Sequence, residues 1–526
     1  MLPDALRRVT DGVTPFFCLI LLIVTLGPHQ FGFHLAELNA PQDVITCHAG
    51  RSPTPSYKFE TTGLNSLPEC IPMSEAQFAT VSSIFTVGGL IGALVAGPFS
   101  SQQGRLTAMQ IASFIFIIGS LIETFSSTIH ALAIGRVLNG LSAGASTVIV
   151  PLYISEIAPV QSRGFFGAFT QITVNIGILF TQTLGYFLSH DGAWRYILFT
   201  GVFLAAAQFI GSFFVPESPA WLVAQDSSAN TLFKAAQILN RLRGLNTNVD
   251  AEVDARSAEE QALLGQDAPG IAIVDNDAEA EEDDQRQGIV AVAPLSPRPA
   301  ATAVKPRPTV GFFGLATNPF YRPALIAVIG IMFAQQVCGI NSVIMYSVSL
   351  LNGMLPLNSA LLTIIISIVN LVATMLSAPL PDRLGRKTCL LVSVVGQGTS
   401  SFLLAFSIVY GIKILSAISV LAFVAFFAVG LGPVPFILAS ELVGQEAVGA
   451  TQSWALGANY VATFLVAQFF PLINTALNAK LGGAGWVYFL FAFFAILSAA
   501  FFWFCVPETN RKKDADEVWG RTARLD

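Results

Sequence analysis

Of the 526 residues in the chain, 53% are hydrophobic and only 11% are charged, and the mean hydropathy is +0.64. Soluble domains are about 25% charged, so this composition excludes an ordinary set of soluble domains. The net charge of -6 comes largely from one segment, because residues 250–284 hold thirteen of the 33 acids. The composition indicates a polytopic membrane protein, and the charge says little about partners.

Twelve apolar stretches are each long enough to cross a bilayer, which takes about 20 residues of helix. Six of them precede a long polar interruption and six follow it. The sequence therefore predicts an all-α membrane protein with 12 transmembrane helices in two six-helix bundles. The predicted spans lie near 14–36, 78–99, 107–127, 131–154, 164–188, 195–216, 322–347, 357–380, 387–411, 414–440, 450–474 and 485–506.

Basic residues of the short loops and tails predict the orientation of these spans. If both termini are cytoplasmic, twelve Lys and Arg residues lie inside and five outside, in agreement with the positive-inside rule. In the central loop, 230–244 has helical periodicity and 249–310 is acidic, then Pro-rich, which is typical of disorder. The predicted regions are a cytoplasmic N-terminus (1–13), a bundle (14–216), a cytoplasmic loop (217–321), a second bundle (322–506) and a cytoplasmic C-terminus (507–526).

Three landmarks recur at corresponding places in the two sets of spans. "GPFSSQQGRL" follows the second span and "APLPDRLGRK" the eighth. "PLYISEIAPVQSRG" follows the fourth span and "ILASELVGQEAVG" the tenth, while the sixth ends in "VPESP" and the twelfth in "VPET". These matches indicate an internal duplication, which is how many transporters are built.

Six motifs, in their order and spacing, carry a resemblance to a known family. They are "GRVLNGLSAGAS", "PLYISEIAP", "PESP", "QQVCGINSVIMYS", "DRLGRK" and "VPET". From about Leu26 to about Lys513, apart from the central loop, the chain resembles the sugar-porter branch of the major facilitator superfamily. The resemblance implies two bundles that rock about a central site. It implies a facilitative or proton-coupled carrier of a hexose or a related sugar or polyol.

Polar side chains in several spans are suited to bind a sugar, whose hydroxyls need amides and whose C–H face needs an aromatic ring. On an ideal helix Tyr346 lies within about 20° of Gln335. Asn341 falls off that face, and Gly339 marks a candidate broken turn. By resemblance, the substrate-binding residues are Gln171, Gln335, Gln336, Asn341, Tyr346, Asn370, Phe436 and Asn459.

The alternative role for any one of these amides is to hold helices together. The number of matched positions, with Gln335 and Gln336 adjacent, favours binding. The chain departs from the family at Met345, where a Tyr is expected, at Phe436, often Trp, and at Thr463, where an Asn is expected. The choice of sugar therefore does not carry over from the family.

Charged residues recur at the predicted cytoplasmic ends of the helices in both halves. In the family such residues pair across helices and close the cytoplasmic side in the outward-facing state, and the alternative is ordinary interfacial charge. The first half departs from the family, because Ser101 and Gln102 replace its usual Asp-Arg pair. The implied gate residues are Arg105, Glu156, Arg163, Glu217, Asp382, Arg383, Arg386, Glu441 and Glu508.

Polar residues interrupt the apolar first span. Gln30, His34 and Glu37 are spaced to share one helix face, and we expect Gln30 and His34 to face the transport cavity. His34 stands where proton-coupled relatives carry Asp, and Arg136 matches the family's nearby arginine, so these two are the candidate coupling residues. His34 is either a proton switch or, as we favour, a neutral hydrogen-bond partner. Glu37 either supports protonation of His34 or is solvated at the outer surface.

The six cysteines are too few for a disulfide scaffold. Cys47 and Cys70 share the first external loop, where a disulfide and two free thiols both remain open. The other four fall in or beside spans and are expected to be small packing residues. They are Cys18, Cys338, Cys389 and Cys505.

No metal-ligand spacing, Walker loop or nucleophile constellation stands outside the spans, so we expect no enzyme, no cofactor and no metal. The expected partners are a sugar, H⁺ if transport is coupled, and the lipid bilayer, without nucleic acid or a required oligomer. The plasma membrane and a vacuolar or other internal membrane both remain open. The second hypothesis is a sugar sensor, receptor or trafficking-related protein on the same fold, although only about twenty residues follow "VPET".

Overall fold

The computed structural model describes most of the chain. The predicted disordered segment, 249–310, lies outside the described residues. The described residues are 13–47, 67–159, 162–226, 228–243, 311–351, 359–444, 447–510, 512 and 515–520.

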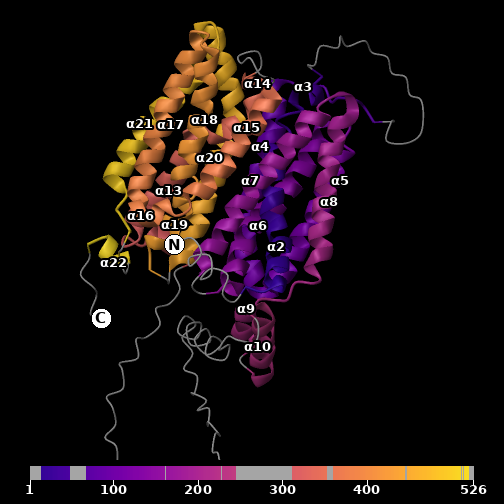
Figure 1. The fold of residues 1–526 in the computed structure, drawn as a ribbon, viewed down its shortest axis with the longest axis vertical. Coiled ribbons are helices and arrows are strands. Elements are labelled where there is room, and N and C mark those ends of the chain that lie inside the picture. The colour runs from indigo at the N-terminus through magenta and orange to yellow at the C-terminus, as the bar shows by residue number, and fades with distance from the viewer. Residues whose placement is uncertain are drawn as a thin grey trace, which may run out of the picture.

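The first half forms a bundle of long helices, drawn from indigo to magenta in Figure 1. Polar side chains start several of them: the Thr14 hydroxyl caps α2, and Ser74 with Gln77 forms a capping box on α4. A short α3 (Gln42–Ile45) follows α2, and the 3-10 turn η3 (Asp191–Ala193) precedes α8. The long helices are α2 (Pro15–Ala36), α4 (Glu75–Gln103), α5 (Arg105–Thr124), α6 (Ile129–Ile157), α7 (Arg163–Leu188) and α8 (Trp194–Ser212).

The second half repeats this arrangement in the orange and yellow bundle of Figure 1, but two of its spans are interrupted. The seventh predicted span is divided into α13 (Arg322–Val337) and α14 (Ile340–Leu351). The tenth is divided into α18 (Lys413–Val429) and α19 (Val434–Glu441). The continuous helices are α15 (Ser359–Ser377), α17 (Arg386–Val409), α20 (Val448–Leu481) and α21 (Trp486–Cys505).

Short helices mark the two ends of the molecule. We name the ends after α3, at the top of Figure 1, and after α9 (Pro219–Gln225), at the bottom. α10 (Ala229–Arg243) follows α9 and confirms the helical periodicity of 230–244. The Thr14 hydroxyl donates to the carbonyl of Leu242 at 2.9 Å, so α10 is tied to the start of α2. The remaining short helices are α12 (Phe312–Thr317), α16 (Leu380–Leu384) and α22 (Ala515–Val518).

Eleven helical segments of the described residues are long and apolar enough to cross a membrane. The remaining predicted span is α7, which carries several amides and hydroxyls and packs against α2 and α15. Large apolar side chains cover the bundles, and Phe504 is 82% and Leu376 71% exposed, as lipid-facing residues are. The predicted all-α membrane fold of two six-helix bundles is confirmed.

The cysteines divide into a bonded pair and four free thiols. Cys47 and Cys70 form a disulfide, which settles the alternative that the sequence left open. Cys338 and Cys389 are buried, as expected of packing residues. The same expectation is wrong for Cys18 and Cys505, which are exposed on the membrane-facing helices α2 and α21.

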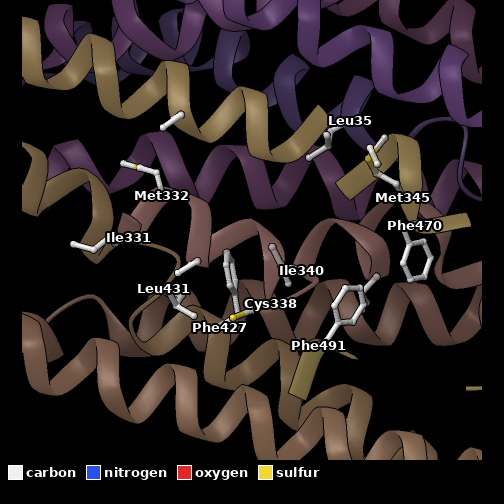
Figure 2. Packing of buried hydrophobic residues seen from close by; sticks show 14 of the residues in the cluster. Leu35, Ile331, Met332, Cys338, Ile340, Met345, Phe427, Leu431, Phe470 and Phe491 are labelled. Carbon is white, nitrogen blue, oxygen red and sulfur yellow. The ribbon is translucent and has the colours of Figure 1, made fainter. Parts of the chain in front are cut away.

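The break between α13 and α14 lies at Gly339, whose φ is +99°. This conformation is open to glycine and strained for other residues. A Cβ on Gly339 would lie 2.5 Å from the Phe491 ring. Figure 2 shows the neighbours Cys338 and Ile340 in the same apolar cluster as Phe491 and Leu431. The broken turn expected at Gly339 is therefore confirmed.

The break between α18 and α19 was not predicted. It falls in "GLGP", Gly430–Pro433, where a proline and two glycines weaken the helix. Ser393 of α17 compensates, because its hydroxyl donates to Phe426 O at 2.6 Å and accepts from the N–H of Leu431 at 2.9 Å. Side chains from a neighbouring helix thus satisfy backbone groups that the break frees.

We expect Gly339→Ala to lower the unfolding temperature of the detergent-solubilised protein. The positive φ and the collision with Phe491 together cost about 2 kcal/mol or more. The matched control is Gly449→Ala in α20, where a new Cβ would meet open space and a small gain is expected. Equal unfolding temperatures for the two variants would contradict the role given to Gly339.

Candidate functional site

Gln335 lies where the two helix breaks meet. Its Nε2 donates to the carbonyl of Leu431, in the α18–α19 break, at 2.5 Å. Its Oε1 accepts hydrogen bonds from Asn459 Nδ2 of α20 at 2.5 Å and from Gln336 Nε2 at 3.2 Å. One amide therefore joins α13, α20 and the second break.

Asn341 extends these contacts into a chain. Its Nδ2 donates to Gln336 Oε1 at 2.5 Å and to Thr463 Oγ1 at 3.3 Å, so the break at Gly339 brings Asn341 back to Gln336. Thr463, which replaces the Asn expected in the family, thus takes part. We call Gln335, Gln336, Asn341 and Asn459 the amide cluster. Its first three members are at most 6% exposed, and Asn459 is half-buried.

Tyr346 lies apart from the amide cluster. Its hydroxyl donates to the carbonyl of Ala467 at 2.8 Å, and its ring lies 6.4 Å from Phe78 and 5.8 Å from Phe470, between centroids. The expectation that Tyr346 shares a helix face with Gln335 is wrong, because Gly339 divides the helix. Tyr346 instead lines a cavity of about 320 Å³ near the α3 end, between the two bundles.

Gln171 and Asn370 meet at a residue that the sequence did not single out, Asn175 of α7. Asn175 Oδ1 accepts from Gln171 Nε2 and from Asn370 Nδ2, both at 3.3 Å, and its Nδ2 donates to Thr374 Oγ1 at 2.9 Å. This group connects α7 of the first bundle with α15 of the second. The signal for Asn175 was present, since it lies one helical turn after Gln171.

Two further aromatic residues, one of which is Phe436, occupy different surroundings. Phe436 on α19 is 40% exposed, unlike the buried amides. Tyr460 on α20 is buried, and its hydroxyl lies 3.3 Å from Thr147 Oγ1 of the first bundle. Tyr460 also fills the space beside Gly89, where a Cβ would lie 2.5 Å from its ring. Tyr460 therefore packs across the bundle interface.

The polar residues of the first span are buried inside the first bundle. His34 Nδ1 lies 2.9 Å from Glu37 Oε2, and Arg136 Nη1 lies 2.6 Å from Glu37 Oε1. Arg136 also donates to the backbone carbonyl of His34 at 2.5 Å. Glu37 is 1% exposed, so the solvated alternative for it is wrong. His34 and Arg136, the predicted coupling pair, are joined through Glu37.

The expectation that Gln30 and His34 face a cavity between the bundles is wrong in this structure. Gln30 Nε2 donates to Gln208 Oε1 of α8 at 2.6 Å. His34 stacks on Phe116 of α5, with ring centroids 5.4 Å apart, and its Nε2 lies 3.4 Å from Ser120 Oγ. Both side chains point into their own bundle because α5 and α8 offer polar partners there.

Glu123 of α5, which the sequence motifs do not single out, belongs to the same group. One nitrogen of His34 and one carboxylate oxygen each of Glu37 and Glu123 all lie within 4.8 Å of one another. We call His34, Glu37, Arg136 and Glu123 the charged cluster. The signal was a single acidic residue in an apolar span, which is rare unless it has a function.

In the first bundle, the gate residues form one connected group at the α9 end. Arg105 binds Glu156 with two nitrogens, at 3.1 and 2.7 Å, and so ties α5 to α6. Glu217 accepts the N–H groups of Arg105 and Leu106 at 3.0 and 3.1 Å and caps α5. Burial raises the pKa of Glu217 above its usual value, while these hydrogen bonds oppose the shift. The side chain of Arg163 lies outside the described residues.

The second bundle repeats this group residue for residue. Arg386 binds Glu441 at 3.1 and 2.9 Å, and Glu508 accepts the N–H groups of Arg386 and Lys387 at 2.8 and 3.1 Å. Asp382, 75% exposed, adds a pair to Arg386 at 2.9 Å. Arg383 is exposed. These described pairs cross between helices, as expected, but each joins helices of one bundle.

Hydrogen bonds between the two bundles gather at the α3 end. Asn39 Nδ2 donates to Ile344 O and to Ser347 Oγ of α14, both at 3.0 Å. Ser83 of α4 donates to Gln468 Oε1 of α20 at 2.8 Å. Further towards the α9 end, the Asn175 group and Tyr460 provide the contacts described above. The α3 end is therefore fastened by side chains of both halves.

Comparison with known proteins agrees with this architecture. A family model described as "Sugar (and other) transporter" matches residues 20–268 and 303–516. The inward-open xylose transporter XylE from E. coli has a TM-score of 0.70 at 22% sequence identity, over 96% of this chain and 99% of that one. At this identity the match supports the major facilitator fold.

Several curated relatives cover nearly the whole chain. A "Probable metabolite transport protein" of Saccharomyces cerevisiae is 32% identical over 523 residues, or 99% of this chain and 98% of the relative. "Vacuolar protein sorting-associated protein 73" of the same yeast is 30% identical, over 96% of each chain. "Solute carrier family 2, facilitated glucose transporter member 3" of Ovis aries is 28% identical, over 95% and 92%. The chain therefore belongs to the sugar transporter family and is a multi-pass membrane protein with the major facilitator fold.

Proposed function

We propose that this protein carries a hexose or a related sugar or polyol across a membrane by alternating access. The observation that carries the proposal is the amide cluster, which brings three buried amides and one half-buried amide from three segments to the two helix breaks. Amides both donate and accept, and so match the hydroxyls of a sugar. Broken helices around a polar site near mid-membrane are the usual construction of secondary transporters.

Within this proposal, the predicted substrate-binding residues take different parts. Gln335, Gln336, Asn341 and Asn459 bind sugar hydroxyls by exchanging their mutual hydrogen bonds for bonds to the substrate. Gln171 and Asn370, which share Asn175, lie at the bundle interface and complete the site when the bundles move. Tyr346 and Phe436 supply aromatic surfaces, Tyr346 at the cavity near the α3 end.

The distribution of contacts supports alternating access. Side chains of both bundles fasten the α3 end, whereas the described ion pairs of the α9 end each stay within one bundle. Exchange between these two arrangements would open one end while it closes the other. The predicted orientation places the α9 end and both termini in the cytoplasm, with the plasma membrane and an internal membrane as the two locations.

A second candidate function is a role in trafficking without transport. It is favoured by one relative, named "Vacuolar protein sorting-associated protein 73", over 96% of this chain. The transport assay below separates the two candidates, because a trafficking protein without carrier activity exchanges no sugar.

Gln335→Ala should reduce uptake of the transported sugar by about tenfold or more in kcat/KM. Loss of two hydrogen bonds to neutral hydroxyls costs about 1–3 kcal/mol. The measurement is counterflow of a radiolabelled panel of hexoses, pentoses and polyols in proteoliposomes. The control is Gln397→Ala, which removes a buried amide of α17 outside the amide cluster. Equal losses of uptake in both variants would argue against the proposed site. If the wild type exchanges no sugar of the panel, the result would argue against the proposed function.

We propose that His34 is a neutral hydrogen-bond partner that holds Glu37 beside Arg136. His34→Asn should then leave the pH dependence of sugar uptake unchanged between about pH 5.5 and pH 8. Asn keeps a hydrogen-bonding group but does not titrate, so uptake after a pH jump measures the contribution of His34 directly. Loss of the pH dependence in His34→Asn would assign the proton to His34 instead.

A further inference from the structure

Glu123 is a buried carboxylate without a donor. It is 0% exposed, and neither of its oxygens receives a hydrogen bond from a donor among the described residues. Its close neighbour is the carboxylate of Glu37, and two carboxylates form a hydrogen bond only when a proton lies between them. A buried charge without a partner is costly, so the site as built favours a bound proton.

Charge balance supports the same assignment. Arg136 neutralises Glu37 in a direct ion pair, which leaves the charge of Glu123 uncompensated. Arg195 of α8 is engaged elsewhere, because it donates to the carbonyls of Thr124 and Ser126 at 2.7 Å and lies over the Trp194 ring. One proton makes the charged cluster neutral. Among the described residues, the charged and titratable groups in this cluster or near it are His29, His34 and Glu37 of α2, Arg136 of α6, Arg195 of α8 and Tyr346 of α14.

The corresponding position of the second bundle carries no carboxylate. The equivalent helices α5 and α17 begin at Arg105 and Arg386. Eighteen residues after these arginines, α5 carries Glu123 and α17 carries Leu404. Leu404 is 0% exposed, so an apolar side chain fills the same position in the second bundle. The acid at position 123 is therefore a feature of the first half alone.

A route connects the charged cluster with the bundle interface. Glu37 lies two residues before Asn39, whose side chain bonds to Ile344 O and Ser347 Oγ of α14. α14 also carries Asn341 of the amide cluster. The charged cluster therefore lies directly beside the segment that holds the two bundles together at the α3 end.

We propose that Glu123 is the proton-binding residue of this carrier. Resting on the proposed transport function, the inference is that the Glu123 carboxylate takes up one proton on one side of the membrane and releases it on the other. The resulting carboxylic acid donates its proton to the neighbouring carboxylate of Glu37 as a hydrogen bond. The proton-loaded cluster is neutral and the unloaded cluster carries one negative charge. His34 is a positioning residue in this scheme.

Glu123→Gln separates exchange from accumulation. In proteoliposomes it should keep sugar counterflow within about threefold of the wild type and lose accumulation driven by a pH gradient. For one proton per sugar, the wild type should accumulate sugar about tenfold per pH unit. Glu123→Asp should retain part of the accumulation, and Asp516→Asn in α22 is the control for loss of an acid elsewhere. If Glu123→Gln accumulates sugar under a pH gradient as strongly as the wild type does, the proposal is overturned.

Two further results distinguish failure of this inference from failure of the proposed function. If the wild-type protein exchanges sugar in counterflow but does not accumulate it under a pH gradient, the role of Glu123 is overturned while the proposed carrier function is supported. If no sugar is exchanged, unfolding temperatures still test proton binding. As the pH rises from about 5 to about 8, the unfolding temperature of the wild type should fall by about 3 °C or more relative to that of Glu123→Gln. A difference that does not change with pH would contradict a proton on Glu123.

Discussion

The constraint behind this structure is that backbone polar groups inside a bilayer must find partners within the protein. Unbroken helices satisfy it by themselves, but the second bundle breaks two of its spans. The breaks persist because side chains replace the lost bonds: Gln335 binds Leu431 O and Ser393 binds the N–H of the same residue. The proposed sugar site follows from this repair, since Gln335 also links the other amides.

Apolar length and repeated motifs were enough to predict the fold. The twelve spans, the two bundles and the helix at 230–244 follow from local patterns that packing did not override. The matched ends of the two halves also indicated the paired groups around Arg105 and Arg386. The matching contacts of the two groups agree with the internal duplication that the repeated motifs indicate.

The positions of individual polar side chains were harder to predict. Tyr346 was misplaced because a periodicity argument assumes a continuous helix, and Gly339 interrupts it. The direction of His34 depended on partners from α5 and α8, which lie far away in sequence. Glu123 was missed because a single acidic residue in an apolar span has no pattern around it, so only the tertiary structure reveals its neighbours. Asn175 carried a sequence signal, its spacing of one helical turn from Gln171, but its contact with Asn370 comes from the tertiary structure.

The two glutamates at the ends of the sixth and twelfth spans have a mechanical consequence. Glu217 fastens the segment after α8 to the first turn of α5, and Arg105 fastens that turn to α6 through Glu156. Glu508 and Arg386 do the same in the other half. Each bundle is thereby cross-linked at one end, as the proposed alternating access requires of a part that moves as a unit. In that proposal, the change of shape falls on the surface between the bundles, where hydroxyls and amides make the contacts and the described ion pairs are absent.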